Sequence, residues 1–227
     1  MGVGRPVSVG GMTILADQVA RYLHALRPTI DPLLAEMEEL AQREGIPIVH
    51  RETGRLLALL CRLADPNVLE VGTAIGYSTV HMARELRRGR IVTLERDPLR
   101  AAQARRFLER AGCSERVEVV EGDALATLPR LSGSFDLLFL DGTKTEYGRY
   151  LALAEPLLAP AALVAVDNVL MGGEVAWPDD RPGAWTPEQR SAVRELARTL
   201  VASERWQGVV LPVGDGVALA SAQKVQN

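Results

Sequence analysis

The stretch that decides the fold is NVLEVGTAIGYST, which runs from Asn67 to Thr79. Its first half is a short apolar run of the kind that forms a buried strand in a parallel sheet. Gly72 and Gly76 follow and predict a turn that leads into a helix. Glycine lets the backbone approach a ligand closely, and the free N–H groups of a helix start can bind polar or anionic atoms. The stretch therefore predicts a nucleotide-type binding turn, with an ordinary, tightly packed strand–helix connection as the alternative.

Two details of this turn narrow the choice of ligand. The segment Gly72-Thr73-Ala74-Ile75-Gly76 has no third glycine and no Gly-Lys-Ser/Thr ending, so it matches neither the dinucleotide fingerprint nor a phosphate loop. Glu70 stands at the end of the strand, where its carboxylate would repel a pyrophosphate but suit a ligand with an amino group and a sulfonium. S-adenosylmethionine carries both groups. We therefore expect Glu70, Gly72 and Thr73 to lie at an S-adenosylmethionine site.

The composition sets the limits of the molecule. A chain of 227 residues is long enough for one α/β domain with a full core. It has 26 Lys and Arg against 29 Asp and Glu, so its net charge of −3 does not indicate nucleic-acid binding. We find no membrane-length apolar run and no signal-peptide pattern, and the two cysteines, Cys61 and Cys113, indicate buried thiols and no disulfide framework. We expect a cytoplasmic protein with no membrane partner.

Outward from the central stretch, strands and helices alternate. Residues 1–11 contain four glycines and read as a loose tail. Apolar spacing predicts N-terminal helices that cover one sheet face or one end of the site, at residues 13–26, 31–44 and 52–64. Strands are predicted at 67–71, 90–94, 117–120, 135–140, 162–166, 206–212 and 216–220, with helices at 77–87, 98–111, 124–131, 146–158 and 187–202. This pattern predicts a single α/β domain (1–227) with a doubly wound, mostly parallel sheet, divided into helices (1–64) and a binding core (65–227). The turn at 213–216 makes the last two strands an antiparallel hairpin.

The carboxyl ends of parallel strands are where such sheets bind ligands. Glu95 ends the second strand, where a carboxylate can hold the two hydroxyls of a ribose. Asp123 and Ala124 follow the third strand, and Asp123 is either a contact for the adenine amino group or a helix cap. Ser78 either binds the carboxylate of the ligand or caps its own helix. These residues complete the expected cofactor site.

Two further strands end in oxygen-bearing side chains. The fourth strand ends in FLDGTK, which places Asp141 and Lys144 at its carboxyl end. The fifth strand ends in VAVDN, which places Asp167 and Asn168 at the carboxyl end of that strand. Carboxylate and amide oxygens without His or Cys suit magnesium, manganese or calcium rather than zinc. The alternatives are that Asp167-Asn168 only begins a loop and that Lys144 is a solvated surface lysine. We expect a divalent cation, magnesium first, at Asp141, Asp167 and Asn168.

Taken together, LEVGTAIGYST, LERD, EGDA, FLDGTK and VDNVLMGG resemble the motifs of the cation-dependent, S-adenosylmethionine-dependent O-methyltransferases, which include the catechol and caffeoyl-CoA enzymes. The resemblance runs from about Pro47 to Val175. It implies a Rossmann-like, seven-stranded sheet whose last strand is antiparallel, and a homodimer. It also implies that Glu70, Gly72, Ser78, Glu95 and Ala124 contact the cofactor. The same resemblance makes Asp141, Asp167 and Asn168 the metal ligands and places Lys144 beside the reacting hydroxyl.

The chain departs from the family pattern at two positions. Thr143 replaces a second acid in the usual D-A-D-K motif, and Met171 replaces a tryptophan that would form a wall of the acceptor pocket. The segment from Trp177 to Trp185 is the expected specificity loop.

The chemistry needs a nucleophile, because a phenol ionises only near a pKa of ~10. A dication at the acceptor oxygen stabilises the oxyanion, and Lys144 would accept the proton or stabilise the developing charge. The expected activity is therefore methyl transfer to a small catechol-like or vicinally oxygenated acceptor.

Three other functions remain open from the sequence. The first is methylation of hydroxyuridine in transfer RNA, for which arginines in the segments 84–90 and 100–110 would have to form a basic surface. Acidic residues are interspersed among them, at Glu85, Glu95 and Glu109. The second is a dinucleotide-dependent oxidoreductase, which the missing third glycine disfavours. The third is a binding module without catalysis, which the presence of Lys144 beside metal-type ligands disfavours.

Overall fold

The computed structural model describes residues 16–222. The glycine-rich tail at 1–11 and the predicted helix start at Thr13 lie outside the described residues. The helices are α1 (Asp17–Ala25), α2 (Pro32–Glu44), α3 (Arg51–Ala64), α4 (Tyr77–Ala83), α5 (Pro98–Arg110), α6 (Ala124–Thr127), α7 (Tyr147–Ala154) and α8 (Pro187–Ala202). The strands are β1 (Val68–Val71), β2 (Ile91–Glu95), β3 (Val117–Glu121), β4 (Phe135–Leu140), β5 (Leu158–Val166), β6 (Trp206–Leu211) and β7 (Val217–Ala222).

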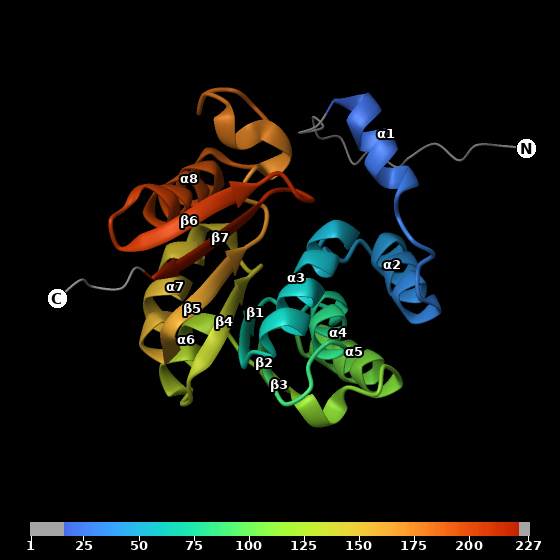
Figure 1. Cartoon of the computed structure of the whole chain (residues 1–227). Coiled ribbons are helices and arrows are strands. Elements are labelled where there is room, and N and C mark those ends of the chain that lie inside the picture. Colours follow the sequence, from blue (N-terminus) through green and yellow to red (C-terminus); the bar gives the residue numbers. More distant parts are fainter. Residues whose placement is uncertain (1–15, 223–227) are drawn as a thin grey trace, which may run out of the picture.

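Within this part of the chain, seven strands form one sheet in the order β3-β2-β1-β4-β5-β7-β6. The pairs β1–β2, β1–β4, β2–β3 and β4–β5 are parallel, and β7 is antiparallel to both β5 and β6. The predicted doubly wound sheet with an antiparallel last strand is therefore confirmed. Figure 1 shows α6, α7 and α8 on one side of the sheet and α3, α4 and α5 on the other.

The two faces of the sheet divide the core into two clusters. Side chains alternate between the faces along each strand, because successive residues of a strand point in opposite directions. Thus Leu138 and Leu140 of β4 pack in the cluster that contains residues of α7 and α8, whereas Leu137 and Phe139 pack in the cluster with residues of α2–α5. Burial on both faces explains why β4 reads as a continuous apolar run. Both cysteines are buried free thiols, as expected.

Three helices end earlier than their apolar patterns predict. The helix predicted at 124–131 ends at Thr127 and gives way to a 3₁₀ turn at 128–130. The helix predicted to run to Arg87 ends at Ala83. The Asp65 carboxylate accepts hydrogen bonds from the N–H groups of Arg87, Arg88 and Gly89, so a contact distant in sequence holds this segment in another conformation. The helix predicted to reach Leu158 gives way after Ala154 to a 3₁₀ turn containing Pro156, which has no N–H for the helical ladder.

The sequence predicts no apolar run long enough to cross a membrane, and the lengths and apolar character of the helices can be compared with this prediction. None of those in residues 16–222 combines the length and the apolar character that a bilayer crossing needs.

Candidate active site

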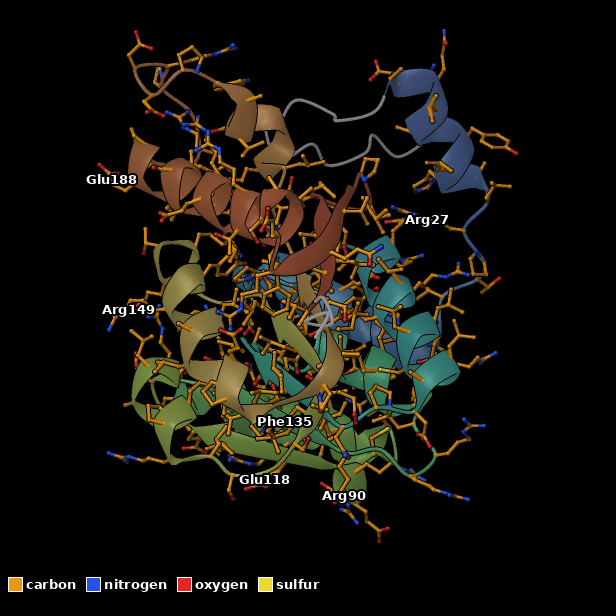
Figure 2. The ribbon with its side chains drawn as sticks, turned by 60° about the vertical axis from the view of Figure 1, so that its left-hand side comes forward. Arg27, Arg90, Glu118, Phe135, Arg149 and Glu188 are labelled. Carbon is orange, nitrogen blue, oxygen red and sulfur yellow. The ribbon has the colours of Figure 1, made fainter. Side chains whose placement is uncertain are left out.

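The predicted site residues lie at one end of the sheet. Figure 2 labels Arg90, Glu118 and Phe135, which mark the amino ends of β2, β3 and β4, at the lower end of the molecule. Arg27 lies toward the opposite end and donates to Glu52 of α3 over 2.6 Å. The carboxyl ends of the parallel strands therefore lie at the end of the molecule where α3 begins.

The segment Gly72–Gly76, here called the cofactor turn, is fixed by its neighbours in the sheet. The N–H groups of Gly72 and Thr73 both donate to the carbonyl oxygen of Leu94, over 3.0 and 3.3 Å. Gly72 has a φ of 103°, and a Cβ added to it would collide with the backbone carbonyl of Asp141. The end of β1 therefore lies so close to the end of β4 that only glycine fits at position 72, even without a ligand.

Glu70 and Ser78 bind each other. The buried Glu70 carboxylate accepts from the Ser78 hydroxyl over 2.5 Å and from the Thr79 hydroxyl over 2.6 Å. Burial raises the pKa of the Glu70 carboxyl, while these hydroxyl donors act in the opposite direction. The capping alternative for Ser78 is wrong: the residue at the N-cap of α4 is Gly76, with no side-chain cap bond in the described structure. Whether Glu70 and Ser78 contact the cofactor stays a prediction.

Glu95 connects the cofactor turn to the end of β2. Its carboxylate accepts from the N–H of Ala74 over 2.8 Å and from the N–H of Asp97 over 2.9 Å. Thr73 and Thr93 share a hydrogen bond of 2.6 Å between their hydroxyls. These bonds leave lone pairs on the Glu95 carboxylate for further donors, as the expected ribose contact requires.

Asp123 is a helix cap, as one of its two predicted roles requires. Its carboxylate accepts from the N–H groups of Leu125 and Ala126, over 2.9 and 3.3 Å. The side chain is exposed, and Ala124 next to it is buried. A contact between Asp123 and adenine stays a prediction that is compatible with capping.

A small hollow opens beside the cofactor turn. It is lined by Gly72, Thr73, Ala74, Tyr77, Ser78 and Asp141, and from the α2–α3 connection by Pro47, Ile48 and Val49. The connection before α3 thus lies over the turn, and the hollow reaches Asp141.

Lys144 is a buried cation at this end of β4. Only 8% of its surface is exposed, so the surface-lysine alternative is wrong. Its ammonium donates to Asp141 Oδ1 over 2.8 Å and to the Tyr147 hydroxyl over 2.7 Å. Burial alone would lower the pKa of Lys144, but the charge of Asp141 and the contact with Tyr147 outweigh it and raise the pKa.

Asp167 is a buried carboxylate with an unused oxygen. The residue is 0% exposed, and Oδ2 has no hydrogen-bond partner among the residues that the structure describes. Oδ1 accepts from the hydroxyl of Thr53 in α3 over 3.5 Å. Burial, followed by the charge of Asp141, raises the pKa of the Asp167 carboxyl. An orphaned carboxylate oxygen in a buried site is costly unless a ligand satisfies it.

Asn168 has a left-handed backbone with a φ of 61°, a conformation that asparagine tolerates. Its side-chain amide donates to Asp215 Oδ2, in the turn between β6 and β7, over 3.3 Å. The three residues Asp141, Asp167 and Asn168 are here called the oxygen cluster.

The chemistry of the oxygen cluster fits a hard dication. Such an ion would satisfy the free oxygen of Asp167 and balance the two carboxylates, and carboxylate and amide oxygens are its preferred ligands. Across residues 16–222, no three side chains of His, Cys, Asp or Glu gather into a metal site. A cation here would therefore depend on the amide oxygen of Asn168 in addition to the two carboxylates.

Thr53, Tyr147 and Asp215 are the site residues that the sequence did not identify. Each contacts the oxygen cluster or Lys144 from a different element. The signal for Asp215 was the Gly214-Asp215-Gly216 turn, which was interpreted only as a hairpin connection. Thr53 and Tyr147 lie within helical patterns that carry no comparable signal.

The predicted specificity loop is held by α8. Arg190 donates to the carbonyl groups of Asp179 and Arg181, and Arg194 donates to the carbonyl groups of Val175 and Trp177. The buried Glu174 accepts from the N–H of Ala184 over 2.9 Å. Met171, which replaces the family's tryptophan, is 0% exposed and packs in the core. The loop is therefore fixed to the body of the protein along much of its length.

The arginines of segments 84–90 and 100–110 are largely paired with acids. Ion pairs join Arg84 to Asp31, Arg87 to Asp65, Arg100 to Asp97, Arg105 to Glu121 and Arg110 to Glu36. This pairing disfavours the basic RNA-binding surface that the transfer-RNA alternative needs.

Residues 28–223 match the family model described as O-methyltransferase. The chain belongs to the O-methyltransferase family. This S-adenosylmethionine-dependent methyltransferase is 38% identical over 198 residues to a catechol O-methyltransferase of Niastella koreensis, covering 84% of this chain and 89% of that protein. It is 30% identical over 230 residues to caffeoyl-CoA O-methyltransferase 1 of Eucalyptus globulus, covering 95% of this chain and 93% of that protein.

A solved structure agrees with the same assignment. The O-methyltransferase TomG of Streptomyces achromogenes, determined in complex with S-adenosylmethionine, is 32% identical with a TM-score of 0.78. The match covers 91% of this methyltransferase and 96% of TomG. The family membership predicted from the five motifs is confirmed.

Proposed function

We propose that this methyltransferase moves a methyl group from S-adenosylmethionine to a hydroxyl of a small catechol-like or vicinally oxygenated acceptor, with a divalent cation. The observation that carries the proposal is the unpartnered oxygen of the buried Asp167 carboxylate. Asp141 and Lys144 lie beside it. The names of the catechol and caffeoyl-CoA relatives support an acceptor with neighbouring oxygens.

The residues of the oxygen cluster would hold the cation, and those of the cofactor turn would hold the donor. Bound S-adenosylmethionine supplies a methyl group that is activated by a sulfonium. A dication supplies charge that lowers the pKa of the acceptor's hydroxyl. Magnesium is the ion we propose, because the cluster offers only oxygen ligands.

The chain's own residues then align and polarise the acceptor. Lys144 is directed by the Tyr147 hydroxyl and by Asp141, so that its ammonium can donate to the acceptor oxygen as charge develops there. The connection at 47–49 lines one side of the hollow beside the cofactor turn and would exclude water there. Alignment of donor and acceptor contributes roughly 7–11 kcal/mol in favourable cases.

The test compares acceptors and cations in one assay. Purified enzyme is incubated with labelled S-adenosylmethionine and catechol, caffeoyl-CoA, a monohydric phenol or hydroxyuridine-bearing RNA. Methylation of the vicinal diols should stop with a chelator and return with Mg²⁺. Turnover that a chelator does not affect would contradict the cation, and turnover of RNA alone would favour the transfer-RNA alternative. In that case affinity should also fall steeply as salt rises.

We also propose that the enzyme forms a homodimer, as the family resemblance implies. Helix α1 supports this, because none of its described residues is buried and Figure 1 shows it held away from the sheet. Val19, Tyr22 and Leu23 expose 47%, 64% and 43% of their surface, which is an apolar face suited to a second copy. Solution mass decides the question, and a monomeric mass at assay concentration would contradict the dimer. The cytoplasm stays the expected compartment.

A further inference from the structure

The turn between β6 and β7 is inserted between α3 and the segment that follows β5. Gly214 has a φ of 57°, and a Cβ added there would lie 2.5 Å from the Thr53 hydroxyl and 2.9 Å from the Cβ of His50. Gly216 has a φ of 87°, and a Cβ there would collide with the side chain of Leu170. The two glycines let the turn backbone pack closely against side chains on both sides, and these contacts fix the position of Asp215 between them.

Asp215 binds the segment after β5 through both of its carboxylate oxygens. Oδ2 accepts from the side-chain amide of Asn168 over 3.3 Å, and Oδ1 accepts from the N–H of Gly172. Its backbone carbonyl accepts from the N–H of Leu170 over 3.0 Å. Each carboxylate oxygen of Asp215 therefore accepts a hydrogen bond from this segment.

This contact decides which end of the Asn168 amide is available to a ligand. An asparagine side chain has one donor end and one acceptor end, and it can exchange them by rotating through 180°. A carboxylate only accepts, so Asp215 takes the NH₂ group and leaves the Asn168 oxygen for another partner. A dication binds the oxygen of an amide and is repelled by its NH₂ group.

We propose that Asp215 is a positioning residue that holds the Asn168 amide with its oxygen toward the oxygen cluster. The inference rests on the proposed cation. It matters here because the described residues offer two carboxylates and no third acidic, cysteine or histidine ligand, so the cation depends on the Asn168 oxygen. Asp215 acts through Asn168 and makes no contact with the cation itself.

Charge offers a competing explanation, because Asp215 also adds negative charge near Asp167. Two substitutions separate charge from orientation. Asp215→Ala and Asp215→Asn both remove the charge. In Asp215→Asn, however, the new amide keeps its oxygen on the N–H of Gly172, which cannot turn around, and points its NH₂ group at Asn168. Asn168 must then rotate and present its own NH₂ group to the cation.

The experiment measures Mn²⁺ binding to the full chain by titration calorimetry, with no acceptor present, so the readout does not depend on activity. We expect Asp215→Asn to weaken Mn²⁺ binding by roughly 10–100-fold, the usual effect of losing a residue that orients a metal ligand. Asp215→Ala should weaken it less, because Asn168 is then free to keep its oxygen inward. The double variant Asn168→Asp/Asp215→Asn should recover binding, because a carboxylate at 168 accepts from the new amide and still offers an oxygen.

The control is Asp136→Asn, which removes one charge at the other end of β4, where Asp136 accepts from the N–H of Asn67 over 2.9 Å. Equal losses in Asp215→Ala and Asp215→Asn would overturn the orientation role in favour of charge. Wild-type binding in Asp215→Asn would overturn the inference and leave the proposed function standing. A wild-type chain that binds no Mn²⁺ would instead overturn the cation site, and the inference with it.

Discussion

The cofactor turn and the oxygen cluster lie at the same edge of the sheet, but their polar groups are satisfied in different ways. Around the turn, the carboxylates of Glu70 and Glu95 accept from hydroxyl and backbone donors of the protein itself. In the oxygen cluster, Asp167 keeps one oxygen without a partner among the described residues. The polar groups of the turn are satisfied within the protein, whereas we propose that a cation completes the cluster. Substitutions in the first should therefore cost stability, and those in the second should cost activity.

The largest expected effect is in the oxygen cluster. Asp167→Ala should lower methyl transfer by about 10³-fold, because removal of a cation ligand costs several kcal/mol of transition-state stabilisation. The fold should persist, since the substitution also removes a buried carboxylate with an unsatisfied oxygen. Turnover numbers with saturating cofactor and thermal melts check this, with Asp136→Ala as a control. A variant that retains full turnover, or one that unfolds, would contradict the contrast between the two regions.

Lys144 offers the next largest effect. Lys144→Met keeps most of the apolar side chain but removes its ammonium, and it should lower kcat by about 10²–10³-fold, as loss of a donor to a developing oxyanion does. The KM for S-adenosylmethionine should change little, because Lys144 binds Asp141 of the oxygen cluster and is not part of the cofactor turn. Steady-state kinetics with each substrate varied measure this separation. If only the KM for S-adenosylmethionine changed, Lys144 would act with the cofactor turn and not with the oxygen cluster.

The cofactor turn should respond through stability. Gly72→Ala adds a Cβ where the Asp141 carbonyl lies and strains a left-handed backbone, so it should destabilise the fold by about 3–5 kcal/mol. Gly76→Ala is the matched comparison, because its Cβ would lie 3.3 Å from the Cβ of Ala104, a tight contact without a collision, so its main cost is the backbone strain of about 1–2 kcal/mol. Urea unfolding compares the two variants. Equal losses would show that packing against Asp141 is not what requires a glycine at position 72.

The smallest effect concerns His81, on the helix that follows the turn. Burial, followed by the charge of Arg84, lowers the pKa of His81 from 6.5 to about 4. Its Nε2 has no hydrogen-bond partner within the described chain, and its ring packs beside Gly54. Between these pKa values the unfolded chain binds the proton more readily, so stability falls as the pH drops from 6.5 toward 4.

We expect a loss of about 1.5 kcal/mol between pH 6.5 and 5 from this residue. His81→Phe keeps an aromatic ring and should flatten the pH dependence of the free energy of unfolding by that amount. Parallel urea titrations at both pH values measure the slope. An unchanged slope in the variant would remove His81 as its source.

The buried strands, the helix caps and the family of this protein could be predicted from local sequence. The apolar runs at Val68–Val71 and Phe135–Leu140 predicted buried parallel strands, because a strand covered on both faces needs apolar residues throughout. The helix predicted at 31–44 begins at Pro32 after its cap Asp31, and Asp123 takes its predicted role as a helix cap, because capping depends only on the next two or three residues. The motif order predicted the family, which the comparisons confirm.

Only the tertiary structure decided which residues the polar groups of the site bind and which segments pack together. Glu70 binds Ser78, Gly72 must admit the backbone of Asp141, and α4 stops where Asp65 takes the following N–H groups. Thr53 and Asp215 reach the oxygen cluster because α3 and the β6–β7 turn pack against the end of β5, at sequence separations of 114 and 47 residues. Secondary structure and capping are local, so the sequence determined them. A hydrogen-bond partner depends on which strands become neighbours, and only the folded sheet fixes that order.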